Sequence, residues 1–142
     1  MFLFNDECKE SNENEGKGVL NIVRKSIKLT LDGKEYTARL NDNRTVEDIL
    51  NMVPMKLTLQ RYDGHEYYSS LPKKPSIKGV PMTSDAHAGG IYYYDGWNAF
   101  TVLFGDAHIA PFEVVHIGDV NEDVISQLAA AGANVEAKIE VN

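Results

Sequence analysis

The sequence predicts a mainly β domain whose antiparallel sheet closes, or nearly closes, into a barrel that carries two short helices. Three observations support this fold class. Short segments with apolar residues at alternate positions recur along the chain, two of them flank the hairpin dipeptide Asp32-Gly33, and only two segments have helical spacing. A chain of 142 residues is also long enough to bury the continuous core of one domain.

The first hairpin is expected around Asp32-Gly33, a dipeptide typical of two-residue turns. Residues 27–31 and 36–40 alternate apolar and polar side chains on either side of it. A two-residue turn pairs Leu29 with Tyr36, which places the apolar side chains of both strands on one face. This agreement between the turn and the apolar pattern supports the register.

Two short amphipathic helices are predicted, each from a capping pair that precedes apolar residues at i, i+3 and i+4 spacing. The first ends at a proline, and the second ends at a glycine. The capping pairs are Thr45 with Asp48 and Asp119 with Glu122, and the end residues are Pro54 and Gly132.

The remaining strands follow from apolar runs and turn signals. Residues 91–94 and 97–104 are apolar at both odd and even positions around Asp95-Gly96, which predicts a hairpin of central strands covered on both faces. Residues 63–89 contain three prolines and no sustained period, so they are either a functional loop region or contain short strands. Further strands are predicted at residues 55–59, 114–117 and 135–141.

Composition limits the partners and the domain boundaries. The net charge of −7, without a local Lys/Arg cluster, opposes binding to nucleic acid. No apolar run approaches the roughly 18 residues of a membrane-spanning helix, so a soluble protein without a membrane span is expected. Residues 1–25 are polar and acidic and are predicted to form a tail, whereas residues 26–142 form the barrel domain.

Cys8 is the only cysteine, so an intrachain disulfide is excluded. Its position before the polar residues 9–18 is similar to the mature start of a bacterial lipoprotein, in which a lipidated cysteine precedes a hydrophilic tether. Residues Asn5-Asp6-Glu7 match the expected cleavage signal poorly. A cytoplasmic location is therefore favoured, and an extracytoplasmic lipoprotein anchored through Cys8 is the alternative.

The ordered set of segments resembles the bacterial cyclophilin-like proteins, a family of uncharacterised small domains that share the cyclophilin barrel. The resemblance runs from about residue 26 to residue 141 and implies a closed antiparallel barrel of about eight strands with helices over its ends. It rests on residues 27–36, 43–54, 57–59, 71–72, 89–94, 98–104 and 116–120.

The resemblance suggests two functions. Active cyclophilins place an arginine in a Phe-His-Arg strand motif that a Phe-Met-x-Gln motif follows. Arg61 lies in the corresponding region, but Gln60 and Tyr62 flank it and no Phe-Met-x-Gln follows. A non-catalytic module that binds a small molecule or a peptide is therefore favoured, and a peptidyl-prolyl isomerase that uses Arg61 is the alternative.

Aromatic residues are the richest candidate feature for such a module. They either fill the barrel core or form a concave surface for an apolar ligand or an extended peptide. A turn at Asp95-Gly96 would set Trp97 beside Tyr94. The candidate ligand-binding residues are Tyr67, Tyr68, Tyr94, Trp97 and Phe100.

The histidines do not predict a metal site. Asp85-Ala86-His87 and Asp106-Ala107-His108 repeat an Asp-x-His pattern, but no two histidines have the close spacing of zinc ligands. His116 lies between Val115 and Ile117 and is expected to be a strand residue. We therefore expect no metal and no cofactor, and exposed loop positions for the other histidines.

Overall fold

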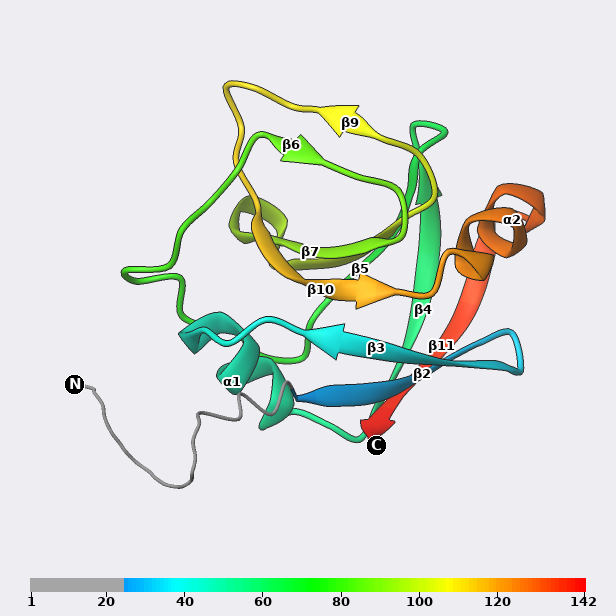
Figure 1. Ribbon diagram of the computed structural model, residues 1–142, viewed down its shortest axis with the longest axis horizontal. Coiled ribbons are helices and arrows are strands. Elements are labelled where there is room, and N and C mark those ends of the chain that lie inside the picture. The colour runs from blue at the N-terminus through cyan, green and yellow to red at the C-terminus, as the bar shows by residue number, and fades with distance from the viewer. Residues whose placement is uncertain (1–24) are drawn as a thin grey trace, which may run out of the picture.

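The computed structural model describes residues 25–142, and it is a closed antiparallel barrel of eight strands with the order β10-β3-β2-β11-β4-β5-β8-β7 (Figure 1). The predicted mainly β barrel with two helices is confirmed. The predicted N-terminal tail lies outside the described residues, apart from residue 25. The barrel strands are β2 (Ser26–Leu31), β3 (Lys34–Leu40), β4 (Met55–Tyr62), β5 (Glu66–Ser70), β7 (Gly90–Tyr94), β8 (Ala99–Leu103), β10 (Val115–Val120) and β11 (Asn134–Val141).

The β2–β3 hairpin has the predicted register. Leu29 lies opposite Tyr36, and Ile27 lies opposite Ala38. Asp32 and the glycine after it have φ angles of 48° and 86°, which are the positive values that a two-residue hairpin turn requires. The alternating pattern therefore fixed both the strands and the face that they bury.

Helix α1 (Arg44–Leu50) begins one position before the predicted capping residue. Asn43 is the N-cap, because its backbone is extended and its side chain accepts a hydrogen bond of 2.9 Å from the amide of Val46. Thr45 is buried instead, and its hydroxyl donates to the carbonyl of Ser76 at 2.7 Å. The predicted cap at Thr45 is therefore wrong.

Helix α2 (Asp123–Ala130) begins later than predicted, because β10 is longer than the apolar run that signalled it. Asp119 pairs with Arg39 of β3 inside the sheet, so it does not cap a helix. The N-cap position belongs to Glu122. In Figure 1, α1 and α2 lie on different sides of the barrel.

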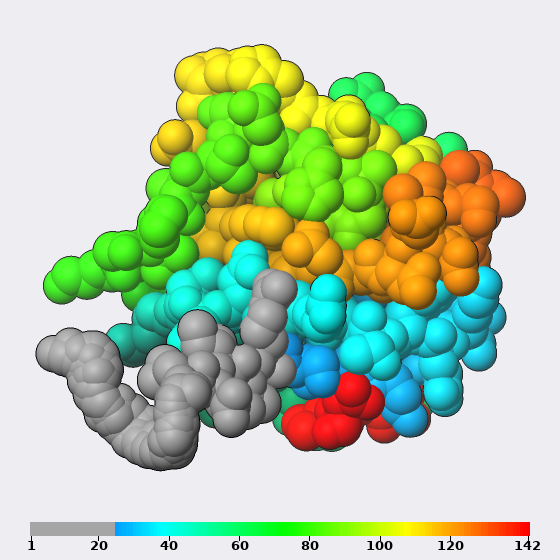
Figure 2. Space-filling model, in the orientation of Figure 1, coloured from blue at the N-terminus to red at the C-terminus, as the bar shows by residue number. Residues whose placement is uncertain are grey.

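The proline-rich region hides two strands. β5 forms a hairpin with β4 through Asp63 and Gly64, whose φ angles of 53° and 70° are again positive. β6 (Asp85–Ala86) pairs with β9 (Ala107–His108) in a two-stranded ribbon outside the barrel. Figures 1 and 2 show the two strands of this ribbon side by side at the top of the molecule.

The connection between β7 and β8 is a 3-10 turn (Asp95–Trp97) closed by Asn98, and not the predicted two-residue turn. Asn98 has a left-handed backbone, and its side chain accepts a 2.7 Å hydrogen bond from the hydroxyl of Tyr93 and donates to the carbonyl of Leu71 at 3.1 Å. These bonds favour the longer turn, which carries Trp97 at its end.

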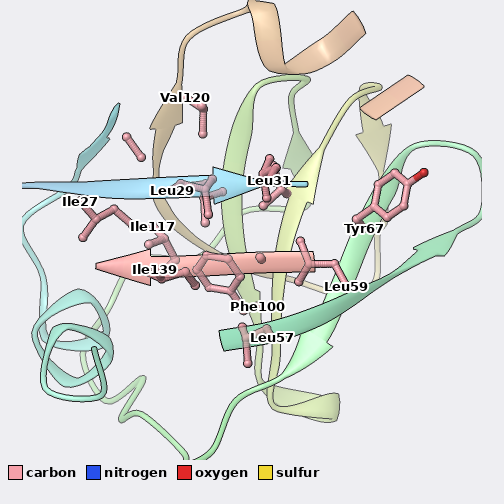
Figure 3. Close-up of a cluster of buried hydrophobic side chains, with 14 of the residues drawn as sticks. Ile27, Leu29, Leu31, Leu57, Leu59, Tyr67, Phe100, Ile117, Val120 and Ile139 are labelled. Atoms are coloured by element: carbon pink, nitrogen blue, oxygen red, sulfur yellow. The ribbon is translucent and has the colours of Figure 1, made fainter. Parts of the chain in front are cut away.

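The interior of the barrel is filled with side chains (Figure 3). Strand residues such as Leu29, Leu59 and Phe100 meet there, and both helices contribute to the same core through residues such as Val46 and Leu128. A ligand site must therefore lie outside the barrel wall. No helix within residues 25–142 is long and apolar enough to cross a membrane.

Candidate functional site

The outer face of β7 and β8 is covered, which gives the wall a second apolar layer. All five residues of β8 are buried, as the apolar pattern at both odd and even positions predicted. On the outside, Tyr92 and Leu103 pack with Ala86 of the ribbon and with Val114. Ala86 pairs with Ala107 across the ribbon.

A pocket of about 640 Å³ lies between this wall and the ribbon. Its floor consists of outward-facing residues of β7 and β8, and its other sides come from the ribbon, from the segment after the ribbon and from the β4–β5 turn. Most of its lining is apolar, which is typical of small-molecule sites. The lining residues include Tyr62, His65, Glu66, Ala86, Tyr92, Tyr94, Trp97, Ala99, Thr101, Leu103, Ala107, Ile109, Phe112 and Val114.

The pocket lining includes five tyrosine, tryptophan and phenylalanine rings, those of Tyr62, Tyr92, Tyr94, Trp97 and Phe112. The ring of Trp97 lies 5.5 Å from that of Tyr62 and 5.8 Å from that of Tyr94, in edge-to-face arrangements. Phe112 lies 6.3 Å from Tyr94 on the other side. Three of these rings are exposed to solvent: Tyr62 by 42%, Trp97 by 49% and Phe112 by 58%. Few other large apolar side chains of the described chain are as exposed. Three of the five large apolar side chains that are exposed in the described chain therefore lie at this one pocket.

One part of the pocket lining is polar. Nε2 of His65 lies 3.1 Å from a carboxylate oxygen of Glu66, and both side chains are 17% exposed. Burial raises the pKa of the Glu66 carboxyl, and the charge of His65 opposes that shift. This pair offers a ligand a hydrogen-bonding group beside an apolar surface.

The structure separates the five predicted ligand-binding residues into two groups. Tyr94 and Trp97 line the pocket, and the ring of Tyr68 lies 5.5 Å from that of Trp97. Tyr67 and Phe100 are fully buried in the barrel interior (Figure 3). The reason is that side chains alternate between the two faces of a strand. Tyr67 and Phe100 occupy positions of β5 and β8 that face inward, and the residues on either side of them face outward.

Tyr67 lies inside the barrel because its segment, for which the sequence allows either a loop or short strands, forms strand β5. The Asp63-Gly64 dipeptide was the missed signal, since it is the same type of turn as Asp32-Gly33 and predicts a strand on either side. The same turn places Tyr62, His65 and Glu66 at one end of the β4–β5 hairpin, where they line the pocket together with Trp97. Phe112 carries no local signal that could have linked it to the pocket.

Arg61 does not face the pocket. Its guanidinium donates hydrogen bonds of 3.1 Å to the carbonyls of Leu128 and Ala131 at the end of α2, and it lies over the ring of Phe104 at 4.6 Å. A cation there also interacts favourably with the helix dipole. Arg61 therefore caps α2, and it is absent from the lining of the pocket that Trp97 borders.

The histidines are more organised than the sequence predicted. Among residues 25–142, one set of side chains has the proximity needed to hold a metal ion, namely His87, His116 and Asp119. His116 is a strand residue of β10, as predicted, and His87 is exposed beside the ribbon. They converge because the segment after β6 lies against β10, which no local spacing reveals.

Comparison with known proteins adds the family. A family model described as the cyclophilin-like family matches residues 29–140. The fold is similar to that of a hypothetical protein from Archaeoglobus fulgidus determined in solution, with a TM-score of 0.57, 18% identity, and coverage of 84% of this chain and 96% of that one. At this identity the similarity concerns the fold alone. No curated protein is detectably similar to the chain.

Proposed function

The chain belongs to the cyclophilin-like family, and we propose that it uses the outer wall of its barrel to bind a small, ring-containing apolar ligand without catalysing a reaction. The observation that carries this proposal is the pocket of about 640 Å³ under the β6–β9 ribbon. Its volume falls within the range of roughly 300 to 1,000 Å³ that is usual for small-molecule sites.

The chemistry of the walls supports a ligand with an aromatic or alicyclic ring. Trp97, Tyr94 and Phe112 present ring edges and faces to the pocket, and aromatic side chains interact favourably with other rings in offset or edge-to-face geometry. His65 and Glu66 add a hydrogen-bonding position. A ligand with an apolar body and one polar group fits both features.

A small ligand is favoured over an extended peptide. Peptides that bind sheets commonly add a strand to a free edge. The closed barrel has no free edge, and the ribbon strands beside the pocket are only two residues long, which is too short to pair with an extended peptide. The ribbon also covers the wall from above, which leaves a compact space in place of a long groove. A prolyl isomerase role is disfavoured because Arg61 caps α2.

The experiment is a titration with the neutral dye N-phenyl-1-naphthylamine, measured by energy transfer from Trp97, the only tryptophan. We expect saturable binding of one dye per chain. Phe112→Ala should weaken the affinity about fivefold, which corresponds to about 1 kcal/mol of lost apolar contact.

Met82→Ala is the matched control, because Met82 is 41% exposed and does not line the pocket. This substitution should leave the dissociation constant unchanged. An absence of saturable binding, or an equal loss in Met82→Ala and Phe112→Ala, would contradict the proposed site.

A further inference from the structure

A second group of side chains lies beside the ligand pocket, where β10 passes the start of β7. His116 and Asp119 belong to β10, and His87 follows β6. In a regular strand, residues three apart face opposite sides of the sheet. Here the register of β10 shifts between His116 and Gly118, so the extra residue turns Asp119 to the same side as His116. The burial pattern agrees, because Ile117 and Val120 both face the core.

The glycine in this bulge is required by the packing of the sheet. A Cβ at Gly118 would lie 2.3 Å from the carbonyl oxygen of Arg39 and 3.0 Å from the Cα of Leu40 on β3. Only a glycine at this position lets β10 lie so close to β3 at the β-bulge. The position of Asp119 beside His116 therefore depends on Gly118.

The three side chains converge on one point. Nε2 of His87 lies 2.8 Å from Oδ1 of Asp119, and Nε2 of His116 lies 3.0 Å from the same oxygen. All three ligand atoms lie within 4.8 Å of one another. In a tetrahedral zinc site with bonds of about 2.0 to 2.1 Å, neighbouring ligand atoms are about 3.3 Å apart. Small rotations of the side chains would open the cluster to that spacing.

Neighbouring groups hold the two imidazole rings in place. Nδ1 of His87 lies 3.0 Å from the hydroxyl of Tyr92, which also accepts a 3.1 Å hydrogen bond from the main-chain amide of His87. The ring of His116 is stacked on that of Tyr92. Histidines that bind metals are commonly held in this way by a hydrogen bond at the second ring nitrogen.

We propose that His87, His116 and Asp119 bind one divalent transition-metal ion, with Zn²⁺ as the best match to two imidazoles and a carboxylate. The ion would replace the protons that the two Nε2 atoms share with Asp119. The side chains of His87 and Asp119 are 55% and 44% exposed, so the site is open on one side and a water molecule can complete the coordination. The carbonyl oxygen of Gly118 also lies near the site, 3.1 Å from Nε2 of His116.

The test measures Zn²⁺ binding to the full chain without an affinity tag, by calorimetry and by competition with a chromophoric chelator. A Cys8→Ser background is used throughout, because a free thiolate also binds Zn²⁺. We expect one ion per chain. His87→Ala should weaken the affinity by roughly a hundredfold or more, since it removes a direct ligand.

His108→Ala is the matched control. His108 is an exposed histidine that pairs with Asp85 on the same ribbon and lies outside the cluster. Its loss should not change Zn²⁺ affinity. Co²⁺ should bind the same site and give the intense visible absorption of a tetrahedral ion. The proposal would be overturned if uptake were not stoichiometric, or if His87→Ala bound Zn²⁺ as tightly as His108→Ala.

Discussion

The ring of Tyr92 lies stacked on the ring of His116, with centroids 4.8 Å apart and planes 16° from parallel. Tyr92 also lines the pocket under the ribbon, so one side chain contacts both the pocket and the histidine cluster. Its hydroxyl contacts His87, and its ring contributes to the apolar layer outside the barrel. The two sites therefore share a residue but use different parts of it.

Tyr92→Phe should separate the two sites. The substitution keeps the ring and removes the hydroxyl that contacts His87, so we expect Zn²⁺ affinity to fall about tenfold because an outer hydrogen bond is lost. The affinity for N-phenyl-1-naphthylamine should stay within about twofold, since the apolar wall is retained. Parallel titrations with Zn²⁺ and with the dye measure both effects. A large loss of dye binding with normal Zn²⁺ binding would contradict these roles.

Arg61→Ala should lower the free energy of unfolding by about 1 to 3 kcal/mol, because the carbonyls at the end of α2 lose a charged donor and Phe104 loses its stacked guanidinium. Urea denaturation measures the change. Arg39→Ala is the control, because Arg39 is exposed and makes no side-chain hydrogen bond or ion pair among the described residues.

The same variants test the alternative function. The wild-type protein should not accelerate prolyl isomerisation, whose uncatalysed barrier is about 18 to 20 kcal/mol. If it did, and if Arg61→Ala abolished that activity at a temperature where the variant remains folded, then Arg61 would be a catalytic residue and its assignment as a helix cap would be incomplete.

Gly118→Ala should be among the most damaging single substitutions in the barrel. The added Cβ would meet main-chain atoms of β3, and backbone cannot move aside as a flexible side chain can. We expect a loss of about 2 to 4 kcal/mol in the free energy of unfolding. Gly132→Ala, where a Cβ would meet no atom within 4 Å, should change it by less than about 1 kcal/mol. Similar effects of the two substitutions would contradict the close β10–β3 contact.

Glu66 should make stability depend on pH. Burial raises its pKa above the ordinary value of 4.5, and Asp63 adds to the shift, while His65 opposes it. A carboxyl whose pKa is higher in the folded state binds more protons when folded, so it lowers the free energy of unfolding as the pH rises above 4.5. The lowering is complete once the pH exceeds the folded-state pKa.

Glu66→Gln removes this dependence, so the variant should gain stability relative to wild type as the pH rises above 4.5. Urea denaturation across this range measures the difference. Glu113→Gln, at an exposed residue, is the control and should follow the wild-type profile. A Glu66→Gln variant that loses stability relative to wild type as the pH rises would show that pairing with His65 outweighs burial.

Local patterns predicted the barrel well because each strand carries its own signal. The Asp32-Gly33 turn and the alternation on both sides of it determined the first hairpin to the residue. The same reasoning applied to Asp63-Gly64 would have found β5 and turned Tyr67 inward. The start of α1 carried a weaker signal, since Asn43 and Thr45 are both good capping residues. The structure uses Asn43 as the cap and buries Thr45 against Ser76.

The sites were harder to predict because they are built from contacts between distant segments. Trp97 was found from its neighbour Tyr94, but Phe112 joins them only after the ribbon folds back over β8. The histidine cluster depends on a bulge in β10 that no sequence period reveals. Strand pairing across the barrel supplies this information, and local spacing does not contain it.

The most direct test of the proposed pocket is ¹⁹F NMR of the protein labelled with 5-fluorotryptophan, in which Trp97 gives a single resonance. Titration with N-phenyl-1-naphthylamine should shift this resonance saturably. In Ala107→Phe, where a ring fills the space beneath the ribbon, the shift should disappear while the protein remains folded. A resonance that does not respond in the wild type, or that responds equally in Ala107→Phe, would contradict the claim that this pocket binds an apolar ligand.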